Sequence, residues 1–276
     1  MKTLYRIIAK TPNYLRKFGI IHGIRLLFSM ETRMHQAPGT IKQYQTPGYP
    51  SKIHLRKTVS DHSIFWQCLV LQQYDISGFP QSKNLINQYH KMISEGKRPL
   101  IIDCGGNIGL STLFLGLKFP EAQIIVVEPD RANYEILKSN IKALGDRATP
   151  LLGGVWSQSG HLRIINPDSG SAAFKVDAED SEHADTVPSY TINDICKQAG
   201  TDAPFIIKID IEGAQSNLFQ KNLEWVKNTN LIMMELDDWR LPWQGTSRSF
   251  FSCVSTYPFD YLLSGETIFC FRDFGT

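Results

Sequence analysis

The chain has 276 residues, of which 42% are hydrophobic and 20% are charged. This composition is typical of a globular protein and excludes a disordered or fibrous one. The length accommodates one α/β domain with an extension. The formal net charge is only +2, so no overall basic field points to nucleic acid. We expect no nucleic-acid partner, and no sequence signal indicates a particular oligomeric state.

Five cysteines lie far apart in the sequence, at Cys68, Cys104, Cys196, Cys253 and Cys270. Zinc and dithiol sites need close cysteine pairs, so we expect reduced thiols in a cytoplasmic protein and no metal. No apolar run approaches the ~18 residues that span a bilayer, and basic residues interrupt the N-terminal segment where a leader would be apolar. We therefore expect neither secretion nor a transmembrane anchor.

Residues 1–30 contain six basic residues and no acid. Apolar residues recur at helical spacing between Tyr14 and Phe28, which predicts one basic amphipathic helix after Pro12. Its apolar stripe either covers the main domain or makes peripheral contact with an anionic membrane through residues 14–28. The first is the commoner use of such a stripe, and both interpretations stay open.

Prolines and glycines between residues 36 and 50 predict a loop. The chain is accordingly divided into an extension with a linker at 1–50, a segment at 51–98 that packs on the main domain, and the main domain at 99–276.

From residue 99 onward, strands and helices alternate, which is typical of a parallel sheet wound on both sides. The predicted strands are 99–104, 122–127, 149–155, 205–209 and 231–236. The predicted helices are 107–118, 131–144, 191–199 and 214–226. Residues 160–188 indicate a hairpin-like insertion near the mouth of the site, and 261–263 with 267–271 indicate a closing antiparallel hairpin. The fold class is α/β: a Rossmann-like, mostly parallel sheet with a C-terminal antiparallel hairpin and an N-terminal helical extension.

The turn after the first predicted strand reads Asp103-Cys-Gly-Gly-Asn-Ile-Gly109. Ligands of open α/β sheets bind beyond the carboxyl ends of the strands. Gly105 and Gly109 remove side chains where a ligand approaches the backbone, and the next helix offers free N–H groups. Asp103 can accept a hydrogen bond from an ammonium group, which suits an amino-acid-bearing nucleotide. A nicotinamide dinucleotide competes, but Cys104 replaces the first glycine of its fingerprint.

Glu128 ends the second predicted strand and is followed by Pro129. A carboxylate at this position can accept both hydroxyls of a ribose, and its charge would repel a 2′-phosphate. We therefore place the cofactor beside these two residues, with Asn107 and Val155 as further contacts.

The fourth predicted strand ends in Lys208-Ile-Asp-Ile-Glu-Gly213. Strand periodicity directs Lys208, Asp210 and Glu212 to one side. Unpaired charges are costly in such a setting, so these groups either pair with one another as a structural ladder or face a ligand. Both interpretations stay open at this point.

Together, these motifs and Asn140 resemble the FkbM family of methyltransferases that use S-adenosylmethionine (SAM). The shared patterns are D-x-G-x-N-x-G at 103–109, Glu128-Pro129, K-x-D-x-E-G at 208–213 and an upstream L-R-x-x-x-x-D at 55–61. The resemblance implies a class I methyltransferase domain at 99–276 with SAM as cofactor and no required metal. It also implies O-methylation of a hydroxyl on a sugar or secondary metabolite, so the expected partner is a small-molecule or glycan acceptor.

Two positions depart from the family pattern. Gln215 stands where members often have an acid, and Asp237 stands where many have histidine, which disfavours a histidine base. We expect Asp210, with Lys208 and Glu212, to be catalytic. The residues that we expect on the acceptor side are Arg56, Asp61, His62, Glu235 and Asp237.

Two alternatives belong to other classes: a nicotinamide-dependent reductase, and a catalytically silent protein that binds SAM or docks on a membrane. Cofactor identity separates the first, and acceptor-dependent release of S-adenosylhomocysteine separates the second.

Overall fold

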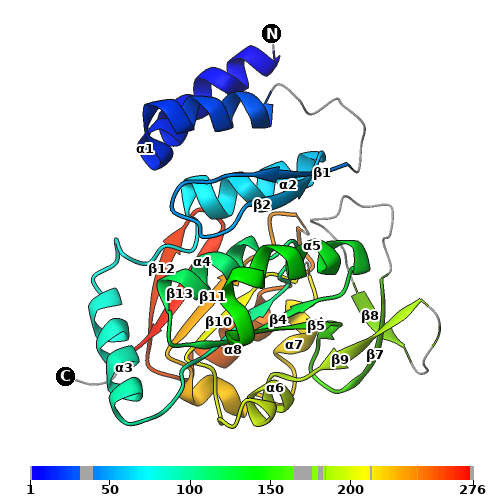
Figure 1. The fold of residues 1–276 in the computed structure, drawn as a ribbon. Helices are drawn as coiled ribbons and strands as arrows, with labels where there is room; N and C mark the ends of the chain where they lie inside the picture. The colour runs from blue at the N-terminus through cyan, green and yellow to red at the C-terminus, as the bar shows by residue number, and fades with distance from the viewer. Residues whose placement is uncertain are drawn as a thin grey trace.

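The computed structural model describes residues 2–31, 40–164, 176–179, 183, 185–211, 213–240 and 242–273. Figure 1 shows an α/β core, with the N-terminal helical element α1 (Lys2–Glu31) above a layer formed by β1 (Ile41–Tyr44), β2 (Ile53–Arg56) and α2 (Val59–Phe65). No helix within the described residues is both long and apolar enough to cross a membrane.

The central sheet has seven strands among the described residues. Their order is β12 (Phe259–Ser264), β13 (Thr267–Arg272), β11 (Leu231–Glu235), β10 (Ile206–Ile209), β3 (Leu100–Cys104), β4 (Gln123–Glu128) and β5 (Ala148–Leu152). Strands β5, β4, β3, β10 and β11 are parallel, and β13 runs antiparallel between β11 and β12. This confirms the predicted Rossmann-like sheet with a closing C-terminal hairpin, and it differs from the 3-2-1-4-5-6 order of a dinucleotide-binding sheet.

Alternate residues of the strands enter two separate cores, because successive strand side chains point to opposite faces. Ile101 and Ile206 pack on one face, and Ile102 and Ile207 pack on the other. The first face is covered by α3 (Ser82–Ser94), α4 (Leu110–Lys118) and α5 (Arg131–Ile141). The second is covered by α6 (Ile192–Gln198), α7 (Gln215–Leu218), η3 (Glu224–Asn228) and α8 (Arg248–Val254). The short η2 (Lys142–Arg147) joins α5 to β5.

The predicted third strand is wrong in its extent, because it divides at Gly153. A Cβ at Gly153 would lie 2.5 Å from the carbonyl oxygen of Pro188, so the chain turns there into a second sheet. That sheet has the order β6 (Gly154–Val155), β9 (Thr186–Tyr190), β7 (Gly160–Ile164) and β8 (Val176–Glu179). The antiparallel pairing of β7 with β8 confirms a hairpin in the insertion. Residues 165–175, 180–182 and 184 of that stretch lie outside the described residues.

The predicted helix at 214–226 is also wrong, since only α7 and η3 form there. Between them, Asn222 adopts a left-handed backbone with φ of 56°. Its side-chain amide donates a hydrogen bond to the carbonyl of Ser157 over 2.7 Å. This anchored turn ends the helix.

The N-terminal segment differs from its prediction in two respects. The helical element begins before Pro12 and breaks at Gly19, whose φ is 74°, so it is a pair of helices and not one. The predicted loop contains β1 (Ile41–Tyr44), which pairs antiparallel with β2 (Ile53–Arg56). Tyr14 packs on Trp66 at a ring-centroid distance of 5.6 Å, which joins α1 to the consecutive helices α2 (Val59–Phe65) and η1 (Trp66–Leu71).

The break divides the predicted apolar stripe. Tyr14, Phe18 and Leu27 are buried, whereas Ile21 and Phe28 are 80% and 50% exposed. One part of the stripe therefore covers the core, and another part faces outward.

Candidate functional site

The turn between β3 and α4 is shaped by close backbone contacts. A Cβ at Gly105 would lie 1.9 Å from the carbonyl oxygen of Asp210, so only glycine lets the β3 and β10 ends meet there. Gly109 has φ of 81° and precedes α4 without a side-chain cap, which leaves N–H groups of the first helical turn available. The glycines that we assigned to ligand approach thus also have packing reasons within the protein.

Glu128 lies at the carboxyl end of β4 and is only 4% exposed. It accepts hydrogen bonds from the backbone N–H of Asn107 over 2.7 Å and of Asp130 over 3.0 Å, and from the Asn133 side chain over 3.2 Å. Burial raises the pKa of Glu128 to about 7, although these hydrogen bonds lower it. The carboxylate is therefore fixed beside the β3 turn and titrates near neutral pH. Pro129 follows it and is half-buried.

Arg56 and Asp61, which we expected on the acceptor side, are connected to the Glu128 carboxylate through the side chain of Asn133. The Arg56 guanidinium binds Asp61 Oδ1 at 2.8 Å and donates to Asn133 Oδ1 over 2.6 Å, and Asn133 in turn donates to Glu128. Asp61 is fully buried. Sequence reasoning missed Asn133, which stands three positions after the Asp130 cap of α5 and carries no motif of its own. The Arg56–Asp61 pair therefore supports the position of Glu128 through Asn133.

Three further residues that the sequence singled out pack or form hydrogen bonds within the protein. His62 is buried with its ring edge-on to Tyr44, and burial lowers its pKa. Asn140 exchanges hydrogen bonds with the backbone of His54 and donates to the carbonyl of Ile108. Val155 is buried in the core on the second sheet face.

Lys208 and Asp103 form a buried ion pair at paired positions of β10 and β3. Lys208 is 2% exposed and its Nζ lies 3.0 Å from Asp103 Oδ1, and it also donates to the carbonyl of Gly105 over 2.8 Å. Asp103 is fully buried and accepts hydrogen bonds from Ser111 and Thr112 over 2.6 and 2.7 Å. Asp103 is fully buried among these partners, so its direct contact with a ligand ammonium group stays a prediction.

Asp210 and Glu235 extend this cluster toward the surface. Asp210 Oδ2 lies 3.7 Å from Lys208 Nζ, and its side chain is 27% exposed. Burial raises the pKa of Asp210; Lys208 opposes the shift and nearby carboxylates reinforce it. Burial, followed by the charge of Asp210, raises the pKa of Glu235 to about 9. Both groups therefore bind a proton more strongly than ordinary carboxyls do, and the charge of Lys208 favours the ionised form of each. Glu212 lies outside the described residues.

The sequence did not indicate that an aromatic side chain packs against this charged cluster. The ring of Tyr74 is buried, and its centroid lies 5.6 Å from Lys208 Nζ. Gln73 donates to Glu235 Oε2 over 3.3 Å. Both residues follow η1, more than a hundred positions before Lys208 and Glu235, which they contact, and no local pattern connects them.

The two departures from the family pattern contact each other. The side-chain amide of Gln215 donates to Asp237 Oδ2, which also accepts from the backbone N–H of Gly213 over 2.6 Å. A donor at 215 and an acid at 237 thus stand where the family often has an acid and a histidine. The two departures from the expected pattern are therefore neighbours in the structure.

Some site chemistries depend on a metal. Within the residues that the structure describes, no group of three or more His, Cys, Asp or Glu side chains could hold a metal ion. The described site consists of hydrogen-bonding and charged side chains at the strand ends. An acid suited to a ribose ends β4, and the sheet closes with an antiparallel strand. Together they define a Rossmann-like methyltransferase.

Comparison with known proteins identifies the family. The model of the methyltransferase FkbM domain matches residues 103–247, more than half of the chain. The chain therefore belongs to the FkbM methyltransferase family, and its cofactor is SAM, which excludes the nicotinamide alternative.

Individual relatives are distant. Methyltransferase sdnD of Sordaria araneosa is 26% identical over 168 residues, which cover 47% of this chain and 64% of that relative. The match thus spans less than two thirds of the relative's length. Among solved structures, P. horikoshii TYW2 in complex with MeSAdo has 13% identity and a TM-score of 0.36, covering 84% of this chain and 69% of that one. The Methanococcus jannaschii fibrillarin pre-rRNA processing protein has 10% identity and a TM-score of 0.39, covering 63% and 65%.

Proposed function

We propose that this methyltransferase transfers a methyl group to a hydroxyl of a small-molecule or glycan acceptor in the cytoplasm. The observation that carries the proposal is Asp210, a partly exposed carboxylate beside the buried Lys208 at the end of β10. The chain's five cysteines are all free, which supports a reducing compartment.

On the cofactor side, Glu128 accepts the ribose hydroxyls, and the 103–109 turn with α4 faces the polar end of the cofactor. The hydrogen bonds that hold Glu128 come from backbone groups and Asn133, so its position is set before binding. Asn107, Gly105, Gly109 and Pro129 form the surrounding wall. On this side, Arg56 and Asp61 support Glu128. Asp103 supports the turn after β3 through Lys208, which donates to the carbonyl of Gly105. Val155 underlies the site from the core.

On the acceptor side, Asp210 orients the hydroxyl and accepts its proton late in transfer. Its raised pKa makes it a better base than an ordinary aspartate. Burial favours the protonated form of Glu235, which can donate a hydrogen bond to the acceptor, and Asp237 shapes the turn after β10 through Gly213. Glu212 belongs to this proposal from its sequence position alone. SAM supplies an electrophilic methyl group when bound, and holding the reacting atoms in line can contribute ~7–11 kcal/mol.

The division into residues 1–50, 51–98 and 99–276 is part of this proposal, with the last part as the SAM-binding domain. The rival is a silent SAM-binding protein. Release of S-adenosylhomocysteine that depends on an added hydroxyl acceptor would exclude it.

The decisive variant is Asp210→Asn. We expect turnover to fall by roughly 10²-fold or more, the usual contribution of a positioned proton acceptor, while calorimetric SAM affinity changes little. Asp260→Asn, which changes an exposed acid in β12, is the matched control and should keep parental turnover. Parental turnover in Asp210→Asn would instead make the cluster structural.

A further inference from the structure

The first 60 residues differ in charge from the rest of the chain. They contain eleven lysines and arginines and one acid, Glu31, although the whole chain has a net charge of +2. The remaining residues are therefore net negative. Glu31 is buried, with Lys10 Nζ 2.8 Å and Arg6 Nε 3.5 Å from its carboxylate. The excess of basic residues in this N-terminal segment suits an anionic partner.

The same N-terminal segment exposes apolar side chains of α1. α1 folds back at Gly19, and its two halves touch where Gly23 meets the carbonyl oxygen of Tyr14, which a Cβ would approach to 2.6 Å. This contact makes α1 a packed helical hairpin. Six of the fifteen exposed large apolar side chains in the described part of the chain belong to α1. They are Tyr5, Ile8, Ile20, Ile21, Ile24 and Phe28.

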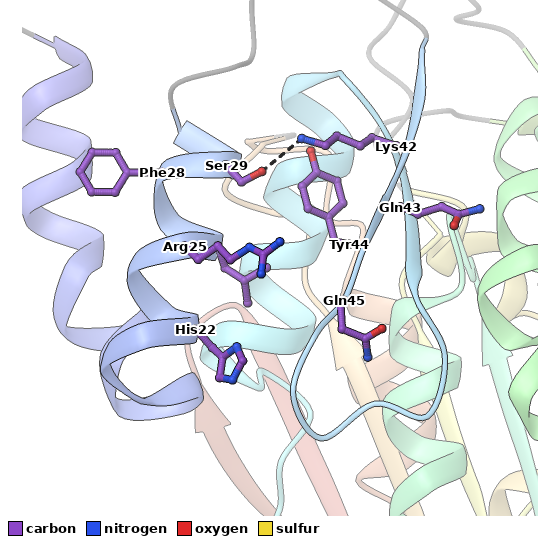
Figure 2. Close-up of a pocket in the computed structure, with 9 residues that line it drawn as sticks. His22, Arg25, Phe28, Ser29, Lys42, Gln43, Tyr44 and Gln45 are labelled. Atoms are coloured by element: carbon purple, nitrogen blue, oxygen red, sulfur yellow. Dashed lines mark hydrogen bonds between the residues drawn. The ribbon is translucent and has the colours of Figure 1, made fainter.

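A pocket of about 490 Å³ lies between the second half of α1 and β1. Figure 2 shows that His22 and Arg25 from α1 and Lys42 from β1 line it, beside Tyr44. The Lys42 ammonium donates to Ser29 over 3.4 Å and lies 5.1 Å from the Tyr44 ring centroid. Arg25 is exposed and has no hydrogen-bond or ion-pair partner among the described residues. A guanidinium and an ammonium on one pocket are suited to a phosphate group.

We propose that α1 docks the protein on an anionic membrane. The exposed isoleucines and Phe28 enter the interface, and the pocket of His22, Arg25 and Lys42 binds the phosphate of an anionic phospholipid headgroup. The apolar side chains distinguish this surface from one that binds nucleic acid, which would need aromatic or polar base contacts. Basic side chains near a membrane and an apolar helical face are the two signals that interfacial helices combine.

Co-sedimentation of the full chain with vesicles tests the proposal. We expect binding to phosphatidylcholine vesicles that contain phosphatidylglycerol, weaker binding to phosphatidylcholine alone, and loss of binding at high salt. Arg25→Gln with Lys42→Gln should weaken binding by roughly fivefold for each charge removed. Lys83→Gln with Lys91→Gln removes two exposed charges from α3 and is the matched control, with no expected change.

The apolar contribution has its own test. Ile20→Ser with Ile21→Ser should reduce binding to the anionic vesicles, whereas Leu263→Ser, which changes a side chain that is 71% exposed in β12, should not. Equal binding to both vesicle types, or parental binding by either the charge variant or the isoleucine variant, would overturn the proposal. If the protein binds single-stranded RNA, and the double isoleucine variant retains this binding whereas the double charge variant loses it, the surface would be assigned to nucleic acid. Displacement from vesicles by inorganic phosphate at low concentration would assign the pocket to free phosphate. SAM binding is measured in parallel, so a failure of the membrane-docking proposal can be distinguished from a failure of the proposed methyltransferase activity.

Discussion

Glu128→Gln should weaken SAM binding and at the same time stabilise the free protein. Glu128 is 4% exposed, and burial raises its pKa to about 7 from 4.5. In the free protein, the folded state therefore retains a proton that the unfolded chain has lost. Stability must fall as the pH rises from 4.5 to 7, by about 3 kcal/mol in total. The amide introduced by Glu128→Gln does not ionise, so the variant lacks this loss.

SAM binding has the opposite dependence on pH. Only the ionised carboxylate can accept hydrogen bonds from both ribose hydroxyls, so parental affinity should be constant above pH 7 and fall about tenfold for each pH unit below it. Hydrogen bonds to charged groups contribute about 1.5–3 kcal/mol each. At pH 8, the loss of one in Glu128→Gln should weaken binding by about 10- to 150-fold, and the affinity of the variant should not follow this titration.

Calorimetric titrations with SAM and thermal unfolding, each at a series of pH values from about 5 to 8 around that pKa, measure both effects. Glu135→Gln is the matched control, since Glu135 is 66% exposed and pairs with Lys138 on α5. Subtracting the variant's pH profile from the parental one isolates Glu128 from other titrating groups. Parental affinity that stays constant between pH 8 and 6, or unchanged affinity in Glu128→Gln, would refute the reasoning.

Two further predictions concern the acceptor side. Lys208→Met leaves the buried Asp103 carboxylate without its cation, so the free energy of unfolding should fall by about 3–5 kcal/mol. Adding Asp103→Asn should recover part of this loss. An unchanged melting temperature in Lys208→Met would contradict the buried ion pair. Gln215→Glu should reduce stability because it sets two carboxylates in contact, and Asp237→His should lose the acceptor for Gly213. The double variant should recover melting temperature and turnover, whereas additive damage would show that the two positions are independent.

The order of the parallel strands and the turn after β3 could be predicted from local sequence patterns. Apolar runs such as Ile101-Ile102 and Ile206-Ile207 specify buried parallel strands, because each residue enters one of two cores. Gly105 and Glu128 stand at strand ends, and the carboxyl ends of parallel strands meet at one edge of a sheet. The position of the proposed cofactor site therefore follows from local order along the chain.

Contacts between side chains that are far apart in the sequence became visible only in the folded protein. The contact of Arg56 with Asn133, and that of Gln215 with Asp237, join elements that no local pattern relates. The tertiary structure also decided where elements stop, since Gly19 and Gly153 end a helix and a strand through a left-handed backbone and a close contact with another segment. Periodicity records which side of an element is apolar. What covers that side depends on packing, which is why the stripe of α1 divides between the core and the surface.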